Sequence, residues 1–177
     1  MTWYRLTNPE SVPSPALLVY PERIKANIDE MVRVAGRVDR LRPHVKTHKC
    51  REIVQMHQAA GITRFKCATI AEAEMLGLCK VEDVLLAYQP SGPNIERIFS
   101  LINEFPDTRF SALVDNPLIV DQLEKRASEL SLSLGLFIDI DAGMNRTGIL
   151  PSPEVIKLLD RIQESDHLGF RGWHVYD

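Results

Sequence analysis

Short apolar runs rich in β-branched and aromatic residues alternate with longer amphipathic segments, and this alternation restricts the fold more than any other feature. We predict strands at 16–20, 41–47, 64–69, 83–88, 109–114, 134–140 and 170–176. The segments between them repeat apolar residues at helical spacing, as in Val155, Leu158, Leu159 and Ile162. From residue 41 the strands begin every ~20 to 36 residues, which is a βα repeat and predicts a parallel sheet.

Two α/β architectures fit this repeat, the doubly wound sheet and the (β/α)8 TIM-type barrel. The chain contains neither GxGxxG nor GxxxxGK[ST], which disfavours a nucleotide-binding doubly wound sheet. About six strands follow residue 40, whereas a barrel needs eight and about 250 residues. The final GWHVYD also ends as a strand, without a turn. We therefore expect an incomplete barrel in a truncated chain, with a complete six-stranded open sheet as the alternative.

Composition excludes several classes of protein. Lys and Arg number 21 against 24 Asp and Glu, a net charge of −3, which argues against a nucleic-acid partner. No apolar run approaches the ~18 residues of a membrane span, and no secretory signal begins the chain. Three cysteines without CxxC spacing predict a reduced, cytoplasmic protein.

The basic run LRPHVKTHK, residues 41–49, is the most unusual stretch of the chain. Alternation along a strand would place Arg42, His44 and Lys46 on one face, and in a barrel that polar face points inward. A lysine at the C-terminal end of an inward-facing strand is placed for chemistry, and cationic neighbours would favour its nucleophilic free amine. The alternative is a solvated basic strand end that binds an anion.

A second polar group follows the strand at 134–140. Asp139 and Asp141 are predicted to point inward, and Arg146 lies on the glycine-containing loop just beyond. Two carboxylates at a strand end could form a metal site, an acid/base pair or counter-ions for an arginine. We prefer an Asp–Arg pair that aims the guanidinium at a ligand, with a structural salt bridge as the alternative.

The last strand predicts a third inward row. Gly172, His174 and Tyr176 share one face if Phe170 begins the row. Tyr176 could donate a hydrogen bond to a cofactor. By themselves, His174 and Tyr176 fit equally well as filling of the barrel interior.

These motifs together resemble a known family. PHVKTHK after IKANI, then DIDAGMNRTG, then GWHVYD, are similar to the D-threonine aldolase / D-serine dehydratase family of fold-type III pyridoxal-phosphate enzymes, which contain the barrel of alanine racemase N-terminal domains. The resemblance runs from Pro15 to Asp177. It implies that residues 21–177 are part of the cofactor-binding barrel. It also implies that residues 1–20 include a strand joining a C-terminal β domain that is absent here.

The resemblance also implies roles for individual residues. Lys46 matches the lysine that holds pyridoxal phosphate as a Schiff base, and Arg146 matches the arginine near the ring oxygen of the cofactor. Asp139 takes the place of a lysine that orients this arginine in alanine racemases. The other implied residues are the cofactor contacts Tyr176, Gln89 and His44, and Asp141, which supports the site.

The activity implied is retro-aldol cleavage of D-3-hydroxy amino acids. Dehydration of D-serine or 3-hydroxyaspartate, racemisation, and non-catalytic binding of pyridoxal phosphate are the alternatives, and so is an anion-binding βα domain without a cofactor. The resemblance further implies a homodimer and a divalent metal, Mn or Zn, bound only by residues of the missing C-terminal region. We accordingly expect the 177-residue chain alone to be inactive.

Overall fold

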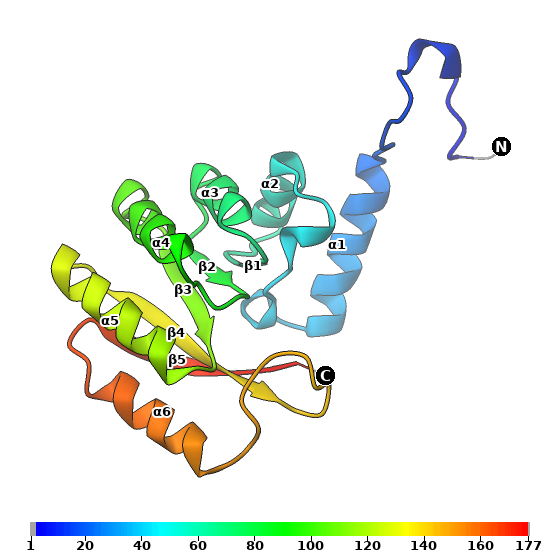
Figure 1. The fold of residues 1–177 in the computed structure, drawn as a ribbon. Helices are drawn as coiled ribbons and strands as arrows, with labels where there is room; N and C mark the ends of the chain where they lie inside the picture. The colour runs from blue at the N-terminus through cyan, green and yellow to red at the C-terminus, as the bar shows by residue number, and fades with distance from the viewer. Residues whose placement is uncertain (1–2, 177) are drawn as a thin grey trace.

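One parallel sheet, with helices packed along its outer face, forms the body of the protein in a computed structural model that describes residues 3–176 (Figure 1). The strands are β1 Arg64–Cys67, β2 Asp83–Leu86, β3 Arg109–Val114, β4 Leu134–Asp141 and β5 Leu168–Tyr176. The α-helices are α1 Pro21–Ala35, α2 Arg51–Ala59, α3 Ile70–Leu78, α4 Pro93–Glu104, α5 Pro117–Leu130 and α6 Pro153–Gln163. Short 3₁₀ turns cover Pro9–Ser11, Val38–Arg40 and Val45–Thr47.

The strands lie side by side in chain order, β1 to β5, and every neighbouring pair is parallel. A doubly wound sheet reverses its strand order, whereas a barrel does not. The topology therefore confirms the predicted α/β class and the partial TIM-type barrel.

The core lies between the sheet and the helices. Alternate strand residues such as Phe65, Phe110 and Ile138 are buried against apolar residues of the helices, including Leu76 and Leu123. Burying each such side chain contributes about 1.5–3 kcal/mol. The opposite, concave face of the sheet carries the polar residues, as expected for the interior of a barrel mouth.

Two predicted strands do not form. Residues 16–20 belong to no sheet and are mostly exposed, in a segment that extends away from the body (Figure 1). The run 41–47 is reduced to one parallel bridge, His44 to Lys66, followed by the turn Val45–Thr47. The sheet therefore has five strands among residues 3–176, and the expected sixth is a single bridge beside β1.

A β-bulge in β5 changes which residues face the helices. Phe170 pairs with Leu136, yet Gly172 pairs with Phe137, so Arg171 is the extra residue. Gly172 has φ +140°, a conformation that favours glycine. Phe170 thus packs with the core and does not begin the inward row, while His174, opposite Asp139, points inward as predicted.

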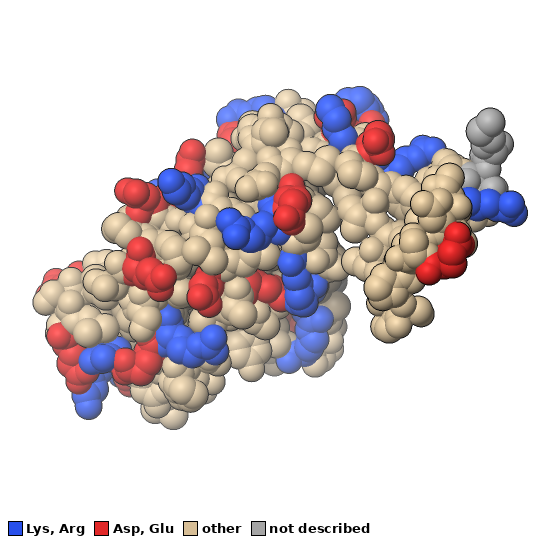
Figure 2. Space-filling view, turned by 90° about the horizontal axis from the view of Figure 1, so that it is seen from above, with Lys and Arg blue, Asp and Glu red and all other residues tan. Residues whose placement is uncertain are grey.

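The surface shows no single-sign patch over the face seen from above, where acidic and basic side chains are interspersed (Figure 2). Within residues 3–176, none of the helices combines the length and apolar character that crossing a bilayer requires.

Candidate active site

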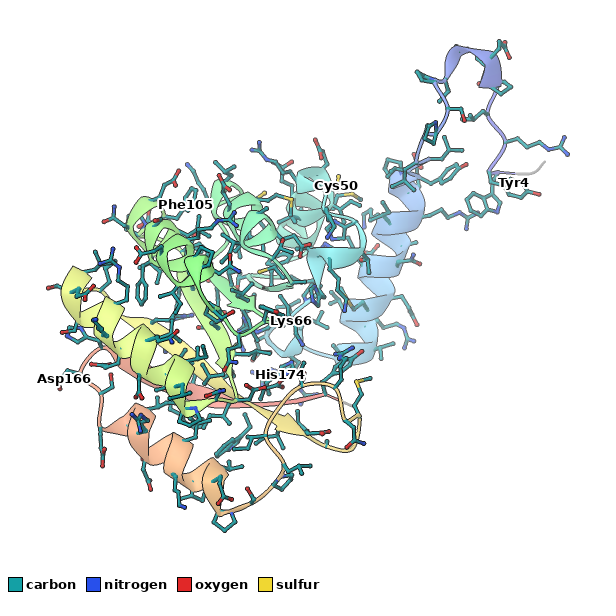
Figure 3. All side chains as sticks on the ribbon, viewed as in Figure 1. Tyr4, Cys50, Lys66, Phe105, Asp166 and His174 are labelled. Carbon is teal, nitrogen blue, oxygen red and sulfur yellow. The ribbon has the colours of Figure 1, made fainter. Side chains whose placement is uncertain are left out.

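A contact between the first and last strands defines the centre of the concave face. Nζ of Lys66 on β1 lies 2.6 Å from Nε2 of His174 on β5 (Figure 3). In a flat sheet, strands four places apart would be separated by roughly 19 Å. The sheet is therefore strongly curved, and side chains from its two edges meet inside the partial barrel.

His174 continues this contact to the neighbouring strand. Its Nδ1 lies 2.5 Å from Oδ1 of Asp139 on β4, and both side chains are largely buried. The His174 ring is also parallel to that of Tyr176, with centroids 6.5 Å apart and 8° between the planes. Lys66, His174, Asp139 and Tyr176 thus form one continuous cluster.

Lys46 lies at the edge of this cluster, on the turn Val45–Thr47. Val45 is completely buried and anchors the turn, whereas the side chain of Lys46 is exposed. The backbone N–H of Lys46 donates to Nδ1 of His44, 3.1 Å away. The predicted strand at Lys46 is thus wrong, because the 3₁₀ turn begins directly after the bridge at His44. The positive charge of Lys46 still acts on His44 and Lys66, which places it at the mouth of the concave face.

A buried carboxylate fixes this turn to the sheet. Glu72 on α3 forms an ion pair with Lys49, and its Oε2 accepts the backbone N–H of Ala68 at 2.7 Å. Lys49 itself has φ +50°, a strained conformation for a residue with a side chain. The Lys49–Glu72 pair therefore holds the end of the turn against the C-terminal end of β1.

The two predicted carboxylates have separate tasks. Asp139 binds His174 and makes no ion pair with Arg146, contrary to the preferred Asp–Arg pair. Oδ1 of Asp141 accepts the backbone N–H groups of Gly143 at 2.9 Å and Asn145 at 3.0 Å, so it shapes the loop after β4. These hydrogen bonds lower the pKa of Asp141.

Arg146 reaches the cluster through an aromatic ring. Its guanidinium lies 5.2 Å from the ring centroid of Tyr176, and the ammonium of Lys66 lies 5.6 Å from the same centroid. These are cation–π distances. Tyr176 is therefore the residue that brings the predicted arginine next to Lys66 and His174.

Gln89 lies beside a hollow of about 190 Å³ at the C-terminal ends of β2 to β4, which Asp139 also lines. Its Oε1 accepts the backbone N–H groups of Asp115 at 3.0 Å and Asn116 at 3.2 Å. The amide oxygen of Gln89 thus serves the loop before α5.

The electric field of the cluster is dominated by cations. Burial lowers the pKa of His44 to about 4, and the positive charges of Lys46 and Lys66 act in the same direction. Burial also lowers the pKa of Lys66; Lys46, Arg42 and Arg146 add to this, and only Asp139 opposes it. The mouth is therefore suited to an anionic ligand.

The sequence missed Lys66, Lys49 and Glu72. A lysine between Phe65 and Cys67, two residues that alternation assigns to the core, was the available signal for Lys66. Arg42, predicted to point inward, does so: it forms an ion pair with Asp83 and lies over the ring of Phe137. Among residues 3–176 no group of three or more His, Cys, Asp or Glu could hold a metal ion.

Comparison with known proteins gives one family. Residues 19–176 match the family described as "Alanine racemase, N-terminal domain". The chain is 25% identical to the D-threonine aldolase of Arthrobacter sp over 166 residues, which are 93% of this chain and 43% of that protein. It is 26% identical to the D-threo-3-hydroxyaspartate dehydratase of Delftia sp. (strain HT23) over 137 residues, 77% of this chain and 36% of that protein.

Solved structures agree with the sequence relatives. The crystal structure of D-threonine aldolase from Filomicrobium marinum is similar with a TM-score of 0.83 and 26% identity, covering 92% of this chain and 44% of that one. The chain therefore spans less than half the length of the relatives it matches.

Proposed function

Since the chain belongs to the family of alanine racemase N-terminal domains, we propose that it is the cofactor-binding part of a pyridoxal-phosphate-dependent lyase acting on D-3-hydroxy amino acids. Retro-aldol cleavage of the D-threonine aldolase type is the proposed reaction. The observation that carries the proposal is the exposed amine of Lys46, presented on a tight turn at the mouth of a concave face rich in cations.

The donor set fits this cofactor. Pyridoxal phosphate needs an amine for covalent attachment and cations for its phosphate and ring oxygen. Lys46, Lys66 and Arg146 supply positive charge, and Asp139 is already engaged with His174. We assign covalent attachment to Lys46 and the ring oxygen to Arg146, with further contacts from the three residues Tyr176, Gln89 and His44.

When bound, pyridoxal phosphate supplies an electron sink for negative charge developing at the substrate's Cα. The chain's own residues supply position and proton transfer. Nζ of Lys46, at the mouth of the concave face, exchanges a proton with the substrate's Cα. His44 stays neutral at pH 7 because of its low pKa, so its Nδ1 remains the acceptor that holds the backbone N–H of Lys46. Asp139 and Asp141 hold His174 and the loop that carries Arg146.

Dehydration is the second candidate, because the dehydratase from Delftia is as similar in sequence as the aldolase from Arthrobacter. Aldolase and dehydratase differ in which bond to Cα is broken, and orientation of the substrate decides this. Products separate the two reactions: glycine plus acetaldehyde from D-threonine indicates the aldolase, and pyruvate plus ammonia from D-serine indicates the dehydratase.

For the whole protein we further propose a cytoplasmic homodimer that uses Mn²⁺ or Zn²⁺. The described residues do not form a metal site, so we assign no metal role to this chain. Assays with and without added metal after chelation test the metal, and mass measured in solution tests the dimer.

The decisive experiment follows the amine itself. The protein expressed over its complete reading frame is incubated with pyridoxal phosphate, reduced with borohydride and digested, and the label is located by mass spectrometry. We expect the label on Lys46, its loss in Lys46→Met, and its retention in Lys157→Met, a control on the exposed surface of α6. Label on another lysine would refute the assignment. In a separate sample loaded with pyridoxal phosphate but not reduced, a lack of both product pairs would favour a non-catalytic binder of the cofactor.

A further inference from the structure

Lys66 was given no role above beyond its positive charge, although its ammonium lies among the polar side chains of the concave face. It reaches across from β1 to β5, and its ammonium meets Nε2 of His174 at 2.6 Å (Figure 3). The side chain of His174 is 14% exposed, that of Asp139 is 6% exposed and Lys66 is half-buried, so the contact is partly shielded from water. A hydrogen bond made under these conditions is stronger than one at the surface.

The chemistry of the three groups fixes where the protons lie. A lysine ammonium donates and cannot accept, so Nε2 of His174 must be the acceptor and carry no proton. In model peptides an amine is more basic than an imidazole by about four pKa units. The negative charge of Asp139 also favours the ammonium form of Lys66 against the effect of burial, so the shared proton stays on lysine. The ring proton of His174 is then on Nδ1, which donates it to Oδ1 of Asp139.

We propose that Lys66 is a positioning residue of the active site, which holds His174 as the neutral Nδ1–H tautomer between Lys66 and Asp139 and thereby sets the plane of Tyr176. This inference rests on the proposed function, because Tyr176 is a proposed cofactor contact. The parallel rings of His174 and Tyr176, 8° apart, are the structural link from Lys66 to the cofactor.

The charges around His174 support this assignment. Asp139 faces it from β4 and Tyr176 adjoins it on β5. Lys46, Arg42 and Arg146 add positive potential around Lys66. Lys66 already occupies Nε2 of His174, the ring nitrogen that faces these cations.

Histidine tautomers can be measured directly. We would label the protein with ¹⁵N-histidine, record the ring nitrogen shifts by NMR and assign His174 among the five histidines with His174→Gln. At pH 7 we expect His174 to have a protonated Nδ1 and an unprotonated Nε2. An Nε2–H tautomer or a doubly protonated ring would overturn the proposal, and this measurement needs no variant of Lys66.

Variants then test the role of Lys66. In Lys66→Met, Nε2 loses its donor while Asp139 remains, so we expect the ring nitrogen shifts of His174 to change from their wild-type values. Lys66→Arg keeps a cationic donor and should restore the wild-type shifts, and Lys157→Met is the surface control. Circular dichroism checks that each variant is folded. Wild-type shifts for His174 in a folded Lys66→Met protein would refute the role of Lys66.

A kinetic measurement tests the role of Lys66 independently of the NMR experiment. In protein loaded with pyridoxal phosphate, we expect Lys66→Met to lower kcat by about 10- to 100-fold, the usual cost of losing a residue that orients a group at the site. The loss should fall on kcat more than on KM, with partial rescue in Lys66→Arg. Unchanged kcat in Lys66→Met would overturn the positioning role. Absence of cofactor binding in the wild type would instead overturn the proposed function, while the NMR result stands by itself.

Discussion

Removing the ammonium of Lys49 tests how the turn that carries Lys46 is held in place. In Lys49→Met, Glu72 keeps its hydrogen bond from the backbone N–H of Ala68 but loses its charged partner. This loss matters because the side chain of Glu72 is only 5% exposed. A hydrogen bond to a charged group contributes about 1.5–3 kcal/mol. Because the Lys49 side chain is 59% exposed, solvent screens part of this, and we expect a loss of about 1–2 kcal/mol. Methionine has the same backbone preferences at φ +50°, so the variant isolates the side chain.

The pH dependence of this loss gives a stricter test. Burial by itself would raise the pKa of Glu72, but the hydrogen bonds from Lys49 and Ala68 outweigh it and the pKa is lowered below 4.5. A lowered folded-state pKa contributes stability that is present above pH 4.5 and is lost as the pH falls through the folded-state value. Without Lys49 this contribution shrinks, so the penalty of the variant should be largest at pH 7 and should decrease as the pH is lowered through the folded-state pKa of Glu72.

Urea unfolding at pH 7 and at low pH measures how the stability penalty of Lys49→Met depends on pH. Lys25→Met is the matched control, since it breaks the exposed Lys25–Asp29 pair of α1 and should cost less than about 0.5 kcal/mol at either pH. An equal penalty for Lys49→Met at pH 7 and at low pH would refute the reasoning, because the cost would then come from packing and not from the buried carboxylate.

Three further predictions concern the same face of the sheet. Burial lowers the pKa of His44 from 6.5 to about 4, so the folded protein loses stability as the pH falls from 6.5 to 4. After screening by solvent we expect this loss to be about 1 kcal/mol. In His44→Gln the urea midpoint should depend less on pH over this range. Gly148→Ala should lower stability by about 2 kcal/mol in thermal unfolding, because φ is +97° and the new Cβ would lie 2.6 Å from the backbone nitrogen of Asp141. Arg42→Met should cost about 1 kcal/mol in urea unfolding, because the largely buried Asp83 then keeps only Arg109 as a charged partner. Asp83→Asn should remove most of that penalty when the two substitutions are combined.

The pattern of apolar residues predicted the bounds of two strands almost to the residue. The run 109–114 has the same bounds as β3, and 134–140 differs from β4 by one residue. The runs 64–69 and 83–88 are each two residues longer than β1 and β2, which end at Cys67 and Leu86. In the first of them Thr69 is already the N-cap residue of α3.

The run 41–47 misled for a physical reason. Its alternation is real as far as His44, but Pro43 has no N–H and can only accept from the neighbouring strand, which it does from Lys66. The N–H groups of His48 and Lys49 then close a turn on the carbonyl of Val45. A basic, alternating run can form either a strand or a turn, and here its contacts with β1 and α3 decide between the two.

The partners within the site were the least predictable part. The motifs predicted that Asp139, Tyr176 and Arg146 lie together, yet the pairing of Asp139 with His174 depends on the register of β5 against β4. Lys66 lies 108 positions away from His174 in the chain, so no local pattern could indicate their contact.

The bulge at Arg171 has a consequence for how this stretch tolerates changes of length. Deleting Arg171 would leave a strand of ordinary pleat in which Phe170 still faces the helices and His174 and Tyr176 still face the cavity, because Gly172 already pairs with the residue next to the partner of Phe170. Loss of Trp173 would have the opposite effect, because every later residue would change face and His174 and Tyr176 would turn toward the helices.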